Sequence, residues 1–159
     1  MFHSDFLKAF QIILELEGGY SDVSGDLGGK TNFGITATLF KNWLKNKKLP
    51  DQDIKTITIE QAQQIYYEEF WKRANCDNYN FPLNLVIFDA AVHSGPSRIK
   101  SFLQYLQSLN TDQKIALDIL MLRFIQLKVL SDKPSQQKFK NGWYNRLHKL
   151  FKAAGFNEQ

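Results

Sequence analysis

The sequence predicts a mainly α-helical domain that carries one small β-hairpin or loop after its first helix. Apolar residues recur at helical spacing along most of the 159 residues, and proline, which breaks helices, occurs only four times. Six of the nine glycines crowd between Gly18 and Gly34, a composition typical of turns or a hairpin. A chain of this length can bury a core of its own, so we expect one domain over residues 1–159.

The first helix is predicted from a single apolar face that ends in a carboxylate. Its members follow one another at steps of four, four, three and four residues: Phe2, Phe6, Phe10, Ile13 and Glu17. Such steps keep side chains on one side of a helix. We expect Ser4 to be the N-cap and Gly18 to stop the helix.

Further helices follow the glycine-rich stretch. Thr36 is the expected N-cap of the next helix, and Thr58 to Gln61 has the form of a capping box. An apolar helix is predicted from Pro82 to Val92 and another from Ser97 onward. The segment Thr111 to Leu130 is apolar nearly all round, so we predict that it is the buried central helix.

Composition excludes several classes of protein. No apolar run is long enough to span a bilayer, and residues 1–19 lack the pattern of a secretory signal. The expected location at synthesis is therefore the cytoplasm. One cysteine, Cys76, and three scattered histidines suggest neither a disulfide nor a metal site, and no cofactor motif is present.

The most reactive group that the pattern predicts is Glu17. A carboxylate at the end of an apolar stripe loses hydration, which raises its pKa and favours the protonated form near neutral pH. A glycosidase needs such a group as the general acid that protonates the leaving oxygen. A glutamate at a frayed helix end that reaches water is the alternative interpretation.

A second carboxylate and a hydroxyl follow in the glycine-rich stretch. Eight residues separate Glu17 from Asp26, and four separate Asp26 from Thr31. Asp26 could stabilise an oxocarbenium-like transition state or, with Thr31, hold an attacking water. Asp22 is a competing second carboxylate, and Asp26 to Gly29 would serve equally well as a plain turn.

These residues resemble a known family. The runs Glu17 to Tyr20 and Asp26 to Thr36 resemble the signature of glycoside hydrolase family 108, the phage-type N-acetylmuramidases also described as endolysins or secretion activators. Phe88 to Pro96 and Gly142 to Arg146 are similar to the family's predicted peptidoglycan-binding segment.

The resemblance implies a lysozyme-like fold with a catalytic half (1–80) and a helical, wall-binding half (81–159). It implies hydrolysis of the β-1,4 bond between N-acetylmuramic acid and N-acetylglucosamine, which would cause wall lysis and an antimicrobial effect. Glu17 would be the acid, with Asp26 and Thr31 assisting, although Thr31 lies one position from the expected spacing. Substrate contact is then expected from five residues: Tyr20, Asn32, Phe33, Asp89 and His93.

One substitution departs from the family pattern. His93 stands where an asparagine is expected, and Asp89 lies four residues earlier on the same helix face. An Asp89–His93 pair that caps neighbouring helices is therefore an alternative to substrate contact.

The expected partner is the glycan strand of peptidoglycan, approached by a monomer of net charge +4. The resemblance further implies that the protein acts on the cell wall (periplasm or outside) only after release, and that its export requires a membrane pore protein. Dispersed lysines without a reading helix argue against nucleic acid as a partner. A lytic transglycosylase and a non-catalytic wall-binding or secretion-assisting protein are the competing functions.

Overall fold

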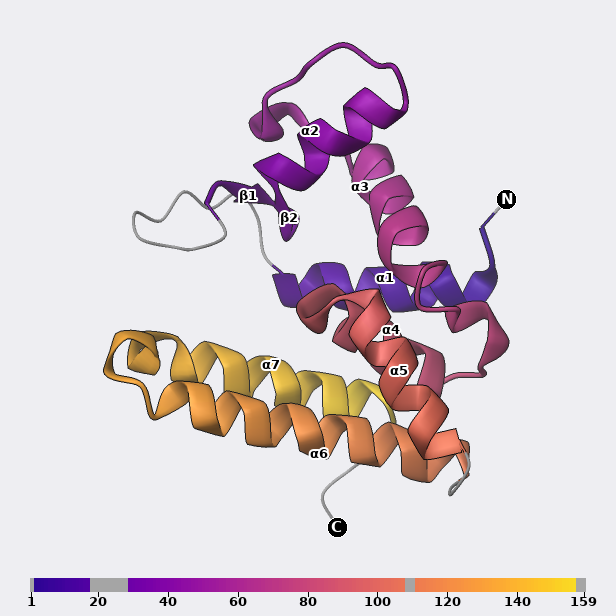
Figure 1. The fold of residues 1–159 in the computed structure, drawn as a ribbon, viewed down its shortest axis with the longest axis vertical. Coiled ribbons are helices and arrows are strands. Elements are labelled where there is room, and N and C mark those ends of the chain that lie inside the picture. Colours follow the sequence, from indigo (N-terminus) through magenta and orange to yellow (C-terminus); the bar gives the residue numbers. More distant parts are fainter. Residues whose placement is uncertain (1, 18–28, 108–110, 157–159) are drawn as a thin grey trace.

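The structure is a computed structural model that describes residues 2–17, 29–107 and 111–156 (Figure 1). Its helices are α1 (Ser4–Glu17), α2 (Ala37–Asn46), α3 (Ile59–Ile65), α4 (Leu83–Ser94), α5 (Pro96–Gln107), α6 (Asp112–Ser131) and α7 (Lys140–Ala153). Short helical turns join them: η1 (Ile54–Thr56), η2 (Tyr66–Trp71), η3 (Cys76–Asn78) and η4 (Pro134–Phe139).

The β structure is a two-stranded antiparallel hairpin. Strand β1 (Thr31–Asn32) pairs with β2 (Ile35–Thr36) in the register Thr31 to Thr36 and Asn32 to Ile35. The predicted fold class, mainly helical with one small hairpin after the first helix, is confirmed.

Helix α1 crosses the middle of the molecule (Figure 1). The hairpin, α2 and α3 lie on one side of it, and α4 to α7 lie on the other. Phe6, Phe10 and Ile13 are buried, so the predicted apolar face of α1 is confirmed. At the start of α1, the Nδ1 atom of His3 accepts a hydrogen bond from the Asp5 amide at 3.3 Å. Ser4, the predicted N-cap, is instead the first helical residue.

The predicted caps of the next two helices are confirmed. The hydroxyl of Thr36 accepts a hydrogen bond from the Leu39 amide at 3.2 Å at the start of α2. Thr58 and Gln61 form a complete capping box at the start of α3. Each cap satisfies backbone donors that the first helical turn leaves without an intrahelical acceptor.

The buried central helix is α4. All nine residues from Leu83 to Ala91 are buried, and α4 packs against α1, α5 and α6. A stretch that is apolar on every side is stable only where other elements surround it. This arrangement places the last turn of α4, with Asp89 and His93, at the junction of several helices.

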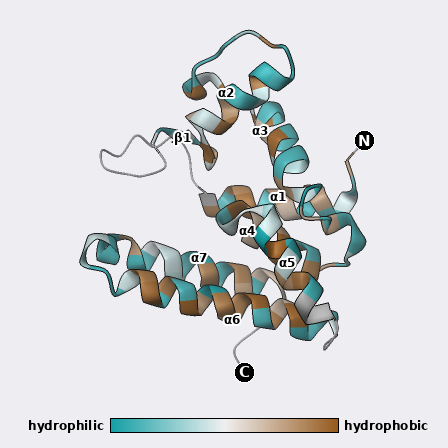
Figure 2. Cartoon of the chain, in the orientation of Figure 1, coloured by the Kyte–Doolittle hydropathy of each residue, from teal (hydrophilic) through white to brown (hydrophobic). Residues whose placement is uncertain are grey.

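The prediction that Thr111 to Leu130 is the central helix was wrong. The first half of α6 buries Ile115, Ile119 and Leu120, but the second half exposes large apolar side chains such as Ile125 and Val129. Figure 1 shows that α6 and α7 run antiparallel and extend beyond the rest of the molecule. Helix α7 and the turn η4 pack against α6, and the apolar surface of α6 is visible in Figure 2.

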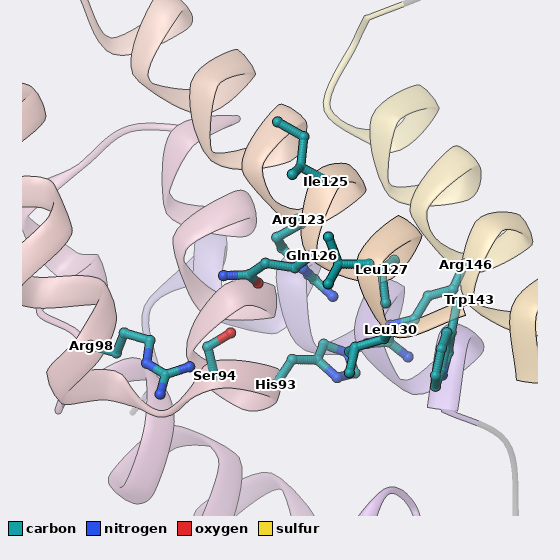
Figure 3. Close-up of a pocket in the computed structure, with 11 residues that line it drawn as sticks. His93, Ser94, Arg98, Arg123, Ile125, Gln126, Leu127, Leu130, Trp143 and Arg146 are labelled. Carbon is teal, nitrogen blue, oxygen red and sulfur yellow. The ribbon is translucent and has the colours of Figure 1, made fainter. Parts of the chain in front are cut away.

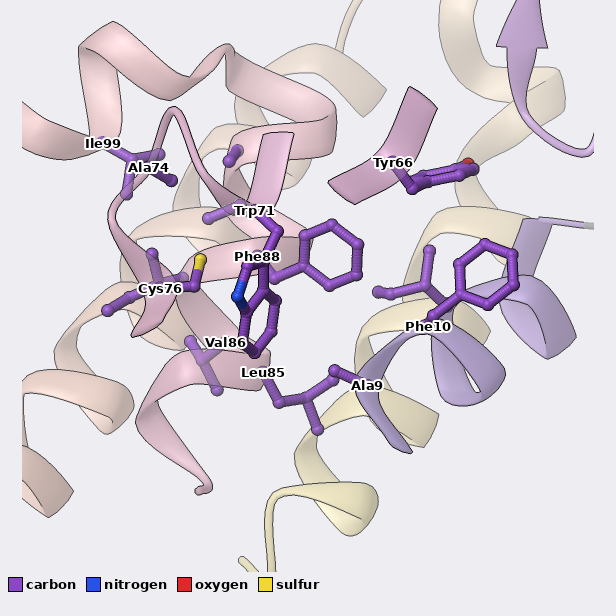
Figure 4. Packing of buried hydrophobic residues seen from close by; sticks show 14 of the residues in the cluster. Ala9, Phe10, Tyr66, Trp71, Ala74, Cys76, Leu85, Val86, Phe88 and Ile99 are labelled. Carbon is purple, nitrogen blue, oxygen red and sulfur yellow. The ribbon is translucent and has the colours of Figure 1, made fainter. Parts of the chain in front are cut away.

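A cluster of aromatic rings joins α1, η2 and α4 (Figure 4). The Phe88 ring lies 5.3 Å from Trp71 and 5.9 Å from Phe6, both in edge-on geometry. Cys76 is buried beside this cluster, and burial raises the pKa of its thiol well above the usual range. No helix within the described residues is long and apolar enough to cross a membrane.

Candidate active site

The predicted acid lies at the carboxyl end of α1. Glu17 is the last residue of this helix and follows the buried Ile13 by four positions, so its backbone is in phase with the apolar face. The side chain of Glu17 and the predicted site residues Tyr20, Asp22 and Asp26 lie outside the described residues. In Figure 1 this helix end lies between the hairpin and the first turns of α7.

The hairpin turn is built by two residues with left-handed backbone. Phe33 has φ 51° and Gly34 has φ 73°, and they are the two central residues between β1 and β2. Positive φ at both central positions is the requirement of a type I′ turn. Glycine adopts this conformation readily, whereas phenylalanine does so only when its surroundings enforce it.

Tyr66 ties this turn to the helix that carries Glu17. Its hydroxyl donates a hydrogen bond of 2.9 Å to the carbonyl of Phe33, and its buried ring lies 5.5 Å from Phe10 of α1 (Figure 4). Phe33 itself packs against the core with its side chain partly exposed. The turn is therefore held at a fixed position relative to the buried face of α1.

Asn32 and Thr31 occupy the strand before the turn. The side chain of Asn32 is buried and donates a hydrogen bond of 3.2 Å to the carbonyl of Ile54. Asn32 therefore anchors the hairpin to η1. The amide of Asn32 faces the protein interior, so this residue does not make the substrate contact that the sequence predicted. Thr31 is partly buried opposite Thr36 in the ladder.

A polar clamp fixes α2 against η2. Glu68 accepts hydrogen bonds from Lys47 Nζ at 2.6 Å and from Trp43 Nε1 at 3.0 Å. Burial works to raise the pKa of the Glu68 carboxyl. The hydrogen bonds from Lys47 and Trp43, together with the positive charges of Lys47 and Lys72, outweigh burial and hold this pKa below its usual value.

Asp89 lies at the centre of a buried ionic cluster and not on a surface that a substrate could touch. It is fully buried, and its carboxylate contacts Arg123 of α6 and Arg146 of α7, the latter at 2.8 Å between Oδ1 and Nη2. The predicted role of Asp89 in direct substrate contact is therefore corrected to the positioning of two arginines. His93 Nε2 lies 3.8 Å from Asp89 Oδ1, as the alternative interpretation of this pair anticipated.

A cavity of about 540 Å³ opens beside this cluster (Figure 3). His93 lines it with about a third (34%) of its side chain exposed, and its predicted contact with substrate stays a prediction. The cavity is also lined by Arg98, Arg123 and Arg146, which were not predicted as site residues. One signal was present in the sequence: Arg123 is a single charge in the apolar run Ile119 to Ile125, where an ion needs a buried partner.

Comparisons with known proteins found a matching family and a similar solved structure. Residues 10–95 match the family model described as Glycosyl hydrolase 108. The structure is similar to the solved structure of Brucella abortus SagA, with a TM-score of 0.71 and 27% sequence identity over 98% of this chain and 97% of that one. No protein with curated annotation matches the chain.

Proposed function

Because this chain belongs to glycosyl hydrolase family 108, and is thus a glycoside hydrolase, we propose that it cleaves the β-1,4 bond between N-acetylmuramic acid and N-acetylglucosamine. The family supports peptidoglycan as the substrate. A net charge of +4 favours the approach of the enzyme to an anionic cell wall.

The observation that carries the proposal is the position of Glu17. It ends α1 in phase with a buried apolar face, and the hairpin is held against the same helix through Tyr66. We expect a carboxyl group that continues an apolar face to lose hydration, which favours the protonated form that a general acid needs. The family match includes both the helix end and the hairpin.

In the proposed reaction, Glu17 donates its proton to the glycosidic oxygen as the bond to the sugar breaks. Asp26 stabilises the positive charge that develops on the sugar ring or, with Thr31, directs a water toward it. Asp22 is the alternative for this second role. Tyr20 and Phe33 would contact the sugar faces beside the acid.

The replacement Glu17→Gln tests the proposal, with Glu15→Gln as its matched control. Glu15 lies on the same helix, is exposed, and accepts a hydrogen bond from Gln11 at 3.1 Å. We expect Glu17→Gln to slow the clearing of a peptidoglycan suspension by about 100-fold or more, because general-acid catalysis contributes this much. Glu15→Gln should clear it at nearly the wild-type rate.

The products decide between the competing functions. Mass spectrometry should find reducing N-acetylmuramic acid ends, since water is the acceptor in hydrolysis. Ends in the 1,6-anhydro form would identify a lytic transglycosylase. A wild-type protein that leaves peptidoglycan intact would instead indicate a wall-binding or secretion-assisting role.

A further inference from the structure

The exposed apolar side chains of this protein are concentrated on one helix. Nine large apolar residues among those that the structure describes are exposed, and six of them lie on α6: Met121, Leu122, Phe124, Ile125, Val129 and Leu130. Val129 and Ile125 are the most exposed, at 59% and 51%. Figure 2 shows this apolar surface along α6. A single exposed leucine is ordinary, whereas an apolar patch of this kind marks a surface that meets a partner or a membrane.

This apolar patch faces away from the rest of the fold. Met121, Ile125 and Val129 follow one another at steps of four residues, so they lie on one face of α6. The opposite face carries Arg123, which is buried against Asp89 of α4. Helix α7 packs against both α1 and α6, and in Figure 1 α6 lies at the other end of the molecule from α2 and the hairpin. A partner on the apolar patch would therefore leave the end of α1 uncovered.

A groove between α6 and α7 continues the patch. It has a volume of about 330 Å³, and its walls include Met121 and Phe124 of α6 and Tyr144 and Phe151 of α7. The rings of Phe124 and Tyr144 lie 5.5 Å apart. Met121 belongs to both the patch and the groove, so the two helices form one continuous apolar surface.

The positive charge of the chain is concentrated in the same segment. From Asp118 to Phe156 the sequence has six lysines against two aspartates, Asp118 and Asp132, which lie beyond the two ends of the apolar patch. This count leaves out the two arginines of the segment, because both contact Asp89. The rest of the chain holds twelve Lys or Arg and fourteen Asp or Glu, so it is net negative. An asymmetry of this kind is typical of proteins that bind a polyanion or an anionic membrane.

Two of these lysines border the apolar surface, one from each helix. Lys128 lies one helical turn beyond Phe124 on α6. The Nζ atom of Lys140, at the start of α7, lies 6.0 Å from the centre of the Tyr144 ring. Both lysines are exposed, and neither forms an ion pair with another residue that the structure describes. Their methylene groups can cover apolar surface while the ammonium groups contact anions.

The charge and the apolar surface together select the kind of partner. A second copy of the chain would bring two positive surfaces together, which like-charge repulsion opposes. A nucleic acid or an anionic wall polymer would attract the lysines but would leave the apolar side chains in water. A bilayer with anionic lipids matches both features, because apolar side chains enter the boundary between headgroups and acyl chains while lysines contact the phosphates.

We propose that α6 and α7 form a docking surface for a bilayer that contains anionic lipids. Helix α6 lies along the membrane surface, with Ile125 and Val129 below the headgroups and with Lys128 and Lys140 among the lipid phosphates. This inference goes beyond the proposed function and does not depend on the reaction at Glu17.

Sedimentation with lipid vesicles tests the docking directly. The full chain is mixed with vesicles of phosphatidylcholine alone or of phosphatidylglycerol and phosphatidylcholine in equal parts, and the bound fraction is measured over a range of lipid concentrations. We expect the chain to bind the anionic vesicles about tenfold or more tightly than the neutral ones, and this binding to weaken as salt is added. Equal binding to both vesicles, or no binding to the anionic ones, would overturn the proposal.

Exposed apolar residues provide a first matched pair of variants. The double variant Ile125→Gln, Val129→Gln removes two exposed side chains of the patch, and we expect its affinity for anionic vesicles to fall about tenfold or more. The control, Leu7→Gln with Leu49→Gln, removes two exposed leucines (42% and 43%) from outside the patch and should bind like the wild type. Circular dichroism confirms that both fold. Undiminished binding by the first variant would mean that charge alone attracts the chain, and the proposal would be wrong.

The lysines provide a second matched pair, which leaves the apolar surface intact. We expect Lys128→Gln with Lys140→Gln to weaken binding to anionic vesicles about tenfold or more, because each lysine near the surface contributes to the attraction. Lys41→Gln with Lys45→Gln removes two exposed lysines from α2 and should change the affinity by less than half of this factor. Equal losses in the two double variants would show a general effect of net charge and would reject the docking surface.

Two further measurements distinguish the other partners. We expect the chain to sediment as a monomer without lipid, and we expect Ile125→Gln with Val129→Gln to leave its binding to lipid-free peptidoglycan unchanged. A dimer that this double variant abolishes, in a chain that does not bind vesicles, would assign the patch to a second copy. A loss of peptidoglycan binding in the same variant would assign the patch to the wall. Either result would overturn the proposal.

Discussion

At the scale of single residues, Phe33 is the most unusual position near the candidate site. A phenylalanine with φ 51° is uncommon, and strained backbone of this kind persists only where neighbouring groups hold it. Here the hydrogen bond from Tyr66 and the packing of the Phe33 ring hold the turn. These contacts keep the Phe33 ring at the end of the hairpin, where the proposed function requires a sugar contact.

Removal of the Tyr66 hydroxyl should weaken this turn. The Tyr66→Phe variant leaves the carbonyl of Phe33 without its 2.9 Å donor, and we expect the free energy of unfolding to fall by about 1 kcal/mol in urea titrations. Tyr67→Phe deletes the same hydroxyl from a neighbour whose described contacts are made by its ring, and it should change stability by less than half as much. Equal losses in the two variants would contradict the role of Tyr66.

The residue patterns that predicted function were local ones. The phase of Glu17 with Ile13 is fixed by helical geometry, so the sequence was sufficient to predict it. The cluster of Asp89, Arg123 and Arg146 was not predicted, because its members are separated by up to 57 residues and meet only when three helices pack. The contact of the Asn32 amide was not predicted either, because it donates to the carbonyl of Ile54, 22 residues away.

At the scale of elements, hydropathy predicted where helices lie better than it predicted how deeply they are buried. Helices α4 and α6 are both apolar on most sides, and the sequence does not state how many neighbours each has. Helix α4 is surrounded by other helices, whereas the far half of the 20-residue α6 extends past them. Burial depends on this packing arrangement, which is a property of the whole fold.

The clamp between α2 and η2 predicts how stability depends on pH. The pKa of the Glu68 carboxyl is lower in the folded protein than its usual value, so the ionised form is favoured by folding. Its contribution should be complete above the unfolded pKa, near 4.5, and should be lost as the pH falls through the lower folded pKa. Because the group is partly exposed, we expect a contribution of at most about 1 kcal/mol.

Urea titrations of wild type and Glu68→Gln between pH 7 and pH 3 measure this contribution. The difference in unfolding free energy should stay constant down to about pH 5 and shrink below it. In a Lys47→Met background, which lacks the 2.6 Å donor, the pH-dependent part should be smaller. A difference between wild type and Glu68→Gln that grows as the pH falls would refute the assigned direction.

At the scale of the whole molecule, one hydrophobic core joins the first and second halves of the chain. The buried cluster runs from Phe6 to Ala154 and includes α1, α4 and α7. Asp89 adds an ionic connection at the same place, because it links α4 to α6 and α7. A buried ion pair is costly to assemble, and an apolar cluster of the same size would often stabilise a protein more. Once assembled, the cluster makes α4, α6 and α7 depend on one buried carboxylate.

Loss of the buried carboxylate should destabilise the entire fold. Asp89→Asn would leave Arg123 and Arg146 buried without the negative charge between them, and we expect the free energy of unfolding to fall by about 3 to 5 kcal/mol. Asp51→Asn is the matched control: it breaks an ion pair with Lys41 in which both side chains are about 70% exposed (71% and 72%). There the loss should be about 0.5 kcal/mol or less, since water screens the pair. Urea denaturation measures the loss in each variant, provided that the m value is unchanged. Comparable losses in the two variants would show that the three-helix junction does not depend on Asp89.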